Sequence, residues 1–338
     1  MGIHGLASWI HWAARSTVAA PDWSAFEGKT IGIDILGFLY KWKHGKQSAF
    51  LQLARMIAAF RRACIRPVFV FDGRPPAAKT THQTTPLTNS VVTTTERTFR
   101  FPSNRAISPL AISSAERDQV KQFLYACGVL SLNAEEEADD VLGAFARSGD
   151  FAAVISHDYD MLARGVETLL VPKPYALPGD GDGWSVYTLS AIERAASLTH
   201  DQFVIMCVLM GCDYTEGIPD MPYCRAYWMA KREGDDALKE AAQQGAVLRL
   251  KGITGKPLMG EKQWEKWYAG APPPEPETLA HWPHLSVLEA QVLTELNGGG
   301  GHGCPGKLDR CIERCIGPQD HPERPEGEHQ KNQEENGG

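Results

Sequence analysis

Four aspartates stand at or just beyond the ends of three predicted β-strands, namely Asp34, Asp72, Asp158 and Asp160. Parallel strands end at the same edge of a sheet, and open α/β sheets build their sites at that edge. Carboxylates gathered in one crevice repel one another at neutral pH unless cations sit between them. Ligation by oxygen atoms alone suits Mg²⁺ or Mn²⁺, so this arrangement predicts a site for such an ion.

Three further acidic residues, Glu135, Glu137 and Asp213, lie next to predicted helices. Side chains two positions apart do not meet on a helix, so Glu135 and Glu137 converge only if Glu135 lies in extended chain before the first turn. Asp213 follows a helix predicted over residues 200–210, whose dipole disfavours an anion at that end. Each acid alone also fits an ordinary turn or helix start, and it is the number of them that favours a metal site.

The elements that position these residues follow from hydrophobic periodicity. Short β-branched or aromatic runs at 29–34, 66–73 and 150–158 predict strands. One apolar stripe at helical spacing lies between the first two strands and comprises Phe50, Leu53, Ile57, Phe60 and Cys64. Another helix begins near residue 138 on acidic side chains and is expected to stop at Gly149. This alternation predicts an α/β fold with a mostly parallel central sheet and helices on both faces.

Other stretches have no clear period. Residues 77–118 are rich in threonine with scattered prolines, which predicts a long inserted loop. A turn-rich connector lies at 175–184, a Pro-rich linker at 269–278, and residues 299–338 predict a disordered tail. The tail holds four residues that could bind metal, although their spacing fits no paired zinc pattern: His302, Cys304, Cys311 and Cys315.

Composition narrows the class of protein. The 338 residues have a net charge of −7, which argues against binding nucleic acid by bulk electrostatics. No window approaches the length of a membrane span and no signal peptide is evident, so an intracellular protein with no membrane partner is expected. The eight cysteines are then expected to be free thiols, most of them buried.

Six motifs in order resemble those of the flap endonuclease family, which includes related 5′ exonucleases and repair-junction nucleases. They are "MGIHGL", "IGIDILGFLY", "VFVFDGRPP", "AEEEADD", "ISHDYDML" and "MGCDYTEGI", and they cover roughly residues 1 to 230. The resemblance implies a PIN-like 5′-nuclease fold with an inserted arch-like loop and a helical C-terminal part. The implied divisions are 1–76 and 119–230 for the nuclease, 77–118 for the arch, 231–298 for the helical part and 299–338 for the tail.

The resemblance also implies what the acidic residues do. The positions matching the family's metal-binding carboxylates are Asp34, Asp72, Glu135, Glu137, Asp158, Asp160 and Asp213. They would hold two Mg²⁺ ions, with Mn²⁺ as a substitute, about 4 Å apart for in-line cleavage of a phosphodiester.

Further positions match residues that meet the substrate in the family. Gly2 resembles the terminal residue beside the active site, Tyr40 the aromatic on which a base stacks, and Lys79, with Arg74 nearby, the lysine at the scissile phosphate. Candidate contacts to the nucleic-acid backbone are Lys41, Lys43, Lys46, Arg97 and Arg100. Each also fits an ordinary core or surface residue.

Three departures from the family pattern concern the substrate. The stretch expected to form a basic arch contains Pro86 and threonines, and Arg97, Arg100 or Arg105 could replace its second essential cation although none of them aligns with it. In the turn at 216–226, which resembles a helix-hairpin-helix, Asp220 and Pro222 replace glycines, so the grip on duplex is expected to be weakened or remodelled. The tail shows neither a sliding-clamp-binding peptide nor a basic nuclear address.

Three functions therefore remain open. The first is a nuclear, monomeric, metal-dependent structure-specific 5′ nuclease that cleaves DNA at 5′ flaps or 5′ ends in replication or repair. The second is an RNA endonuclease of the same superfamily, with which the altered arch and turn are compatible. The third is a non-catalytic nucleic-acid-binding scaffold, against which a full set of seven mutually repelling carboxylates argues.

Overall fold

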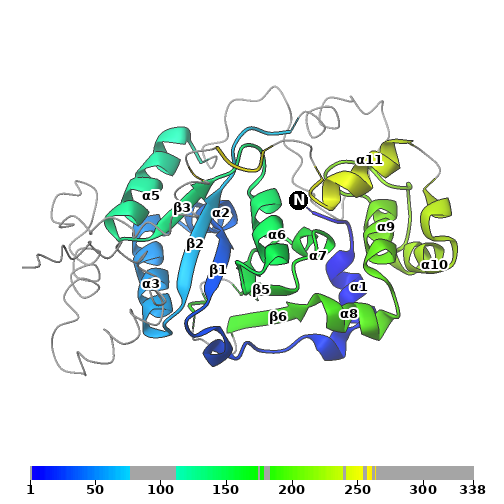
Figure 1. Cartoon of the computed structure of the whole chain (residues 1–338), viewed down its shortest axis with the longest axis horizontal. Helices are drawn as coiled ribbons and strands as arrows, with labels where there is room; N and C mark the ends of the chain where they lie inside the picture. The colour runs from blue at the N-terminus through cyan, green and yellow to red at the C-terminus, as the bar shows by residue number, and fades with distance from the viewer. Residues whose placement is uncertain are drawn as a thin grey trace, which may run out of the picture.

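The computed structural model describes residues 2–76, 112–173, 176–178, 183–238, 241–253, 257–260 and 263. A six-stranded sheet in the order β3-β2-β1-β4-β5-β6 runs through the middle of this part (Figure 1). The strands are β1 Thr30–Asp34, β2 Arg66–Phe71, β3 Leu130–Asn133, β4 Ala153–Ile155, β5 Thr168–Pro172 and β6 Trp184–Thr188. All neighbours pair in parallel except β5 and β6, which pair antiparallel. The predicted fold class is therefore confirmed.

Helices cover both faces of the sheet. They are α1 Leu6–Ala13, α2 Ile35–His44, α3 Ala49–Arg62, α5 Ser114–Ala126, α6 Ala138–Ser148, α7 Asp160–Ala163, α8 Leu189–Ala196, α9 His200–Met210, α10 Tyr223–Glu233 and α11 Ala241–Leu250. One core joins the sheet to α2, α3 and α5, and the other joins it to α1 and to α6 through α11. Strand alternation separates the two cores, since Phe69 faces the first and Val68 and Val70 face the second.

The predicted strands and helices around the acidic residues are present. The stripe beginning at Phe50 lies on α3, and α6 ends where Gly149 adopts a left-handed conformation with φ 89°. In the register of the sheet, Asp34 lies opposite Val70, so Asp72 follows two residues beyond that pair. The strand ends therefore bring Asp34 and Asp72 to the same edge.

Some elements were not predicted. Strands β3, β5 and β6 are short, and β3 directly precedes the acidic run at 135–140. Helix α5 begins at Ser114, inside the predicted insert of 77–118, because Ser113 and Glu116 form a capping box there. Residues 77–111 of that insert, the linker 269–278 and the tail 299–338 lie outside the described residues.

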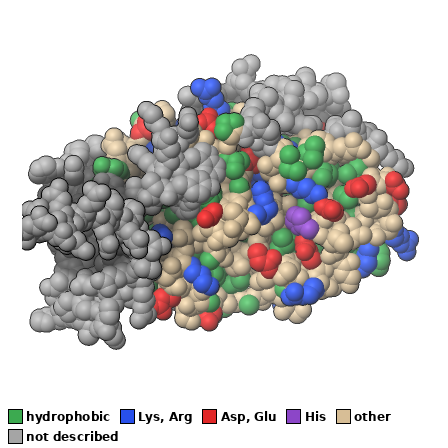
Figure 2. Space-filling view, in the orientation of Figure 1, with side chains coloured by type: hydrophobic (Ala, Val, Ile, Leu, Met, Phe, Trp, Pro, Cys, Tyr) green, Lys and Arg blue, Asp and Glu red, His purple; other side chains and the backbone are tan. Residues whose placement is uncertain are grey.

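The surface charges and the cysteines of the described part resemble those of an ordinary globular protein. Figure 2 shows basic and acidic side chains interspersed over this face, with no continuous basic stripe. Five cysteines in the described part are free, of which Cys127 and Cys207 are buried and Cys224 is exposed. No helix in the described part is long and apolar enough to cross a bilayer.

Candidate active site

Asp34 and Asp72 are held at the carboxyl edge by neighbouring donors. Asp34 ends β1 and caps α2, where its Oδ1 accepts from the Leu36 backbone N–H at 3.2 Å and its Oδ2 accepts from Ser156 Oγ at 3.1 Å. Asp72 Oδ1 accepts from the Ala138 N–H at 2.7 Å, the first residue of α6. Backbone N–H groups at the starts of two helices thus fix the orientation of both carboxylates.

Asp158 and Asp160 meet the amino terminus. The Asp160 N–H donates to Asp158 Oδ1 at 3.0 Å, and the Ile3 N–H donates to Asp160 Oδ1 at 2.7 Å. A Cβ atom on Gly2, whose φ is 140°, would lie only 2.6 Å from Asp158 Oδ1. The terminus can approach these carboxylates because Gly2 has no side chain.

The run 135–140 was predicted to supply Glu135 and Glu137, but the residue that the structure brings within the field of the strand-end aspartates is Asp139. Glu135 is exposed; its carboxylate lies beside Gly260 and its backbone carbonyl accepts from the Arg74 N–H at 3.0 Å. Asp139, in the first turn of α6, instead interacts electrostatically with Asp34, Asp72 and Asp158. The reason is local: the helix begins at Ala138, which turns Asp139 toward the strand ends while Glu135 stays in the chain that follows β3.

We call Asp34, Asp72, Asp139, Asp158 and Asp160 the acidic cluster. Burial raises the pKa of Asp34 to about 7, and the negative charge of Asp72 adds to the shift. Burial likewise raises the pKa of Asp160 to about 6. The pKa of Asp158 and that of Asp139 are also raised, by burial first and then by neighbouring carboxylates. The cluster therefore favours either protons or a bound cation.

Glu137 belongs to a separate arrangement, which we call the arginine network: Glu136, Glu137, Asp140, Arg164 and Arg249. Glu137 Oε2 accepts from Arg164 Nη2 at 3.2 Å and from the Tyr214 hydroxyl. Arg164 also pairs with Asp140, and Arg249 lies 2.8 Å from Glu136 and 3.0 Å from Asp140. Arg164 also lies 3.8 Å from Asp139, so the network borders the cluster. The sequence reasoning missed both arginines.

Asp213 lies beyond the carboxyl end of α9 and is half-buried. Its negative charge contributes to the raised pKa of Asp160, behind the larger effect of burial. The hydroxyl of the next residue, Tyr214, donates to Glu137, so this loop contacts the network and acts on the cluster through the charge of Asp213. The structure thus brings Asp213 to the same edge of the sheet.

The donor chemistry of the cluster fits a hard divalent cation. Its members are carboxylates, and their mutual repulsion is what a cation would relieve. As placed, no three described His, Cys, Asp or Glu side chains stand close enough together to enclose an ion. The residues supply the right ligand type at one edge, and binding would have to draw them inward.

Residues predicted to meet nucleic acid have different surroundings. Tyr40 is half-buried on α2, and Lys41, Lys46 and Arg74 are exposed. Lys43 pairs with Glu116 of α5 at 2.7 Å. Lys79, Arg97 and Arg100 lie outside the described residues.

The turn at 216–226 keeps a backbone that suits glycine. Asp220 is exposed and has φ 53°, in the left-handed region that non-glycine residues seldom adopt. Pro222 precedes α10 and supplies no backbone donor there. An acidic side chain therefore projects from the turn where the resemblance predicts contact with duplex.

Comparison with known proteins gives the same assignment along the chain. The XPG N-terminal domain matches residues 1–86 and the XPG I-region matches residues 128–213, together just over half of the 338 residues. A probable flap endonuclease 1 homologue of Danio rerio is 28% identical over 236 residues, 68% of this chain and 63% of that protein. Flap endonuclease 1 of Schizosaccharomyces pombe is 29% identical over 269 residues, 71% of this chain and 70% of that protein.

Solved structures share the fold at low identity. The catalytic core of Rad2 in complex with DNA substrate has a TM-score of 0.52 at 16% identity and covers 94% of this chain and 86% of its own. Flap endonuclease-1 from Methanococcus jannaschii has a TM-score of 0.54 at 15% identity, and the match covers 88% of this chain and 95% of that one. With two domain matches in the expected order, the chain belongs to the flap endonuclease family of 5′ nucleases.

Proposed function

We propose that this protein is a divalent-metal-dependent, structure-specific nuclease that hydrolyses phosphodiester bonds in DNA at 5′ flaps or 5′ ends. The observation that supports this most is the acidic cluster, where carboxylates face one another at the carboxyl edge of the sheet. Family membership supports the choice of reaction, and the DNA substrate named for Rad2 supports the choice of polymer. A role in DNA replication or repair is part of this proposal.

The described carboxylates divide between two ion positions in this proposal. Asp34, Asp72 and Asp139 would hold one Mg²⁺, while Asp158, Asp160 and Asp213 would help to hold a second. Mn²⁺ would substitute because it accepts the same oxygen ligands. Bound divalent ions supply an activated water and stabilise the leaving oxygen in an in-line displacement.

Other residues would orient these groups and the strand. Ser156 and the Ile3 backbone N–H fix the carboxylates of Asp34 and Asp160 by hydrogen bonds of 3.1 and 2.7 Å. Gly2 keeps the terminus beside them without a side chain in the way. Tyr40 would stack with a base, since such stacking tolerates any sequence.

The test is cleavage of an end-labelled 5′-flap DNA, a plain duplex and a matched single-stranded RNA with Mg²⁺. Wild type is compared with Asp158→Asn and with Asp118→Asn, an exposed aspartate on α5 that serves as the control. We expect cutting at the flap junction by wild type and Asp118→Asn, and none by Asp158→Asn. Cutting that survives in Asp158→Asn would contradict the proposed role of the cluster.

A second candidate is an RNA endonuclease with the same metal site. The observation that favours it is Asp220, an exposed carboxylate in the turn that would otherwise hold duplex. Cutting of the single-stranded RNA alone would select this function. If neither polymer is cut although Mg²⁺ binds, the protein is a binding scaffold.

A further inference from the structure

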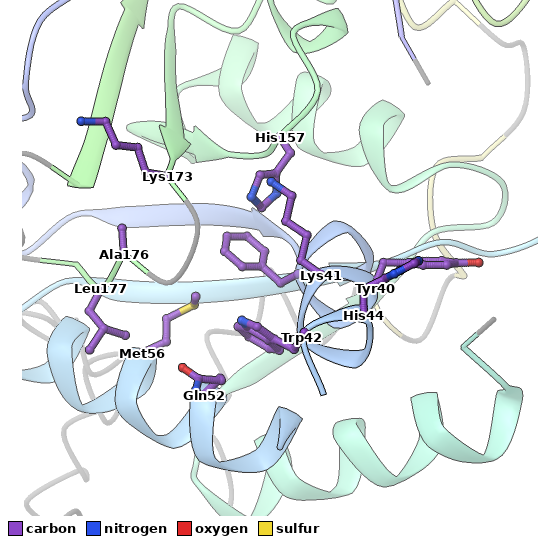
Figure 3. A pocket seen from close by; sticks show the side chains of 12 residues that line it. Tyr40, Lys41, Trp42, His44, Gln52, Met56, His157, Lys173, Ala176 and Leu177 are labelled. Atoms are coloured by element: carbon purple, nitrogen blue, oxygen red, sulfur yellow. The ribbon is translucent and has the colours of Figure 1, made fainter. Parts of the chain in front are cut away.

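A pocket of about 590 Å³ lies beside the acidic cluster, between α2, α3 and the segment that follows β5 (Figure 3). Its volume is in the range of small-molecule and cofactor sites. Part of its wall is apolar and comes from Phe38, Trp42, Met56 and Leu177. The pocket can therefore hold a largely apolar group.

The polar groups of the pocket favour an anion. Lys41, His44 and Lys173 line it, and no aspartate or glutamate is among the lining residues that the structure describes. Lys41 is exposed. The buried Nδ1 of His157 has no hydrogen-bond partner among the described residues. Cations at the wall of an apolar pocket suit a ligand that combines a ring system with a phosphate.

The pocket and the acidic cluster share a wall. His157 lies between Ser156, which donates to Asp34, and Asp158 in sequence. A Cβ atom on Gly37 of α2 would lie 3.3 Å from His157 Nδ1 and 3.5 Å from Asp34 Oδ2. Figure 3 shows Lys41 reaching toward His157 from the same helix. A nucleotide in this pocket would thus lie close to a phosphate held at the cluster.

We propose that the pocket receives one unstacked base of the nucleic-acid substrate, with its adjoining phosphate held by Lys41 and Lys173. This rests on the proposed function, which supplies a strand at the neighbouring carboxylates. The base would lie against Met56, Leu177 and the edges of the buried Trp42 and Phe38 rings. Its polar edge would give His157 Nδ1 a partner, which the pocket otherwise lacks.

The first test measures binding without metal, so that cleavage plays no part. A fluorescein-labelled 5′-flap DNA is titrated by anisotropy in EDTA, with one nucleotide at a time around the junction made abasic. In wild type we expect one position to weaken binding roughly tenfold and the others far less. In Leu177→Trp, which fills the pocket, the same abasic position should cost less than about twofold. Arg66→Gln, an exposed cation at the amino end of β2, should behave as wild type.

Fluorescence at the sensitive position gives an independent reading. 2-Aminopurine placed there should brighten on binding to wild type, because the base leaves its stacked neighbours, and should brighten less with Leu177→Trp. If Leu177→Trp does not fold, Lys41→Gln replaces it. That change should lower the slope of log affinity against log salt by about one, with no change in Arg66→Gln.

Several results would overturn the proposal. They are equal abasic penalties at every position, an unchanged penalty in Leu177→Trp, an unchanged salt slope in Lys41→Gln, or no binding of either DNA or matched RNA. Cleavage with Mg²⁺ is scored separately. A protein that cuts flaps without a position-specific penalty keeps the proposed function and loses the pocket, whereas the reverse pattern keeps the pocket and loses the reaction.

Discussion

Two groups of buried and half-buried carboxylates meet at one edge of the sheet, and their negative charges have opposite surroundings. In the arginine network, Glu137 and Asp140 have guanidinium groups within hydrogen-bonding distance. In the acidic cluster, the charges that act most on Asp34 are those of Asp72 and Asp158. Asp139 stands between the two groups, 3.8 Å from Arg164 and within the field of the clustered aspartates.

This difference suits the arginine network to a structural role and the acidic cluster to binding a cation. A buried charge that is paired has already been compensated by the fold, so it can hold neighbouring elements in place. Carboxylates that raise one another's pKa remain poorly compensated, and a bound cation would release that unfavourable energy. The ion pairs of the network connect α6 and the residues before it to α7 and α11. The cluster lacks such compensation and can bind a cation.

Single substitutions in the acidic run 135–140 give the largest expected effect and test which of its residues belongs to the cluster. Asp139→Asn should lower Mg²⁺-dependent cleavage by more than roughly a hundredfold, the upper end for groups that only support a metal ligand. Glu135→Gln should change it by less than about threefold, because that side chain is exposed. Single-turnover rates on a flap substrate measure both.

A large loss in Glu135→Gln with little loss in Asp139→Asn would reverse this assignment. It would restore the ligand set expected from the sequence alone. Circular dichroism of both variants must show that neither result comes from unfolding.

The network should respond through stability. Arg164→Met removes a side chain that is 2% exposed and leaves Glu137 and Asp140 buried beside one remaining arginine. The expected loss is about 3–5 kcal/mol of unfolding free energy, the usual cost of breaking a buried pair. Urea denaturation in EDTA measures it. Lys121→Met, which breaks an exposed pair with Asp118, is the control and should cost under about 1 kcal/mol.

The double variant Arg164→Met with Asp140→Leu tests the cause. Removing both charges should recover part of the loss, since one buried carboxylate fewer then shares the remaining Arg249. If the double variant is as unstable as the sum of the single variants, packing rather than charge explains the effect.

The cluster should make metal-free stability depend on pH. The pKa of Asp34 is about 7 in the folded protein against 3.8 for an ordinary aspartate. Between those values the folded state keeps a proton that the unfolded chain has released, so this group's contribution to stability falls as pH rises. Urea midpoints in EDTA at about pH 5.5, 6.5 and 7.5 should reveal the decline, and Asp34→Asn should make it less steep.

Mg²⁺ should offset this decline. Binding only to the folded state stabilises it by about 2.7 kcal/mol at a hundred times the dissociation constant. The gain should be larger at pH 7.5 than at pH 5.5, because protons compete with the ion for the same carboxylates. A gain that is independent of pH, or that is undiminished in Asp158→Asn with Asp160→Asn, would mean that the ion binds outside the cluster.

The sequence predicted one part of this edge better than the other. Asp34, Asp72, Asp158 and Asp160 were found because apolar runs fix where strands end. The identity of the residue from the acidic run depended on where α6 begins, and a shift of one or two residues changes which side chain faces the sheet.

The arginine network could not be predicted in the same way. Arg164 follows α7 and Arg249 lies on α11, 27 and 113 residues from their partners Glu137 and Glu136. No local period relates positions so far apart, and each arginine reads in sequence as an ordinary surface cation. The buried acids show their need for a counter-charge only once the fold has brought the helices together.

The solvent exposure of an ion pair, and not the number of pairs, should set how much unfolding free energy is lost when the pair is broken. The pair between α2 and α5 tests this where the expected loss is smallest. Lys43 lies 2.7 Å from Glu116, shorter than the distance from Arg164 to Glu137, but the two side chains are 27% and 42% exposed. Water already solvates both groups, so Lys43→Gln should cost no more than about 1 kcal/mol. Urea denaturation at low and high salt measures it, and the small loss should shrink further as salt screens the pair. A loss as large as that of Arg164→Met would mean that proximity outweighs burial in this protein, and the contrast between network and cluster would then lose its physical basis.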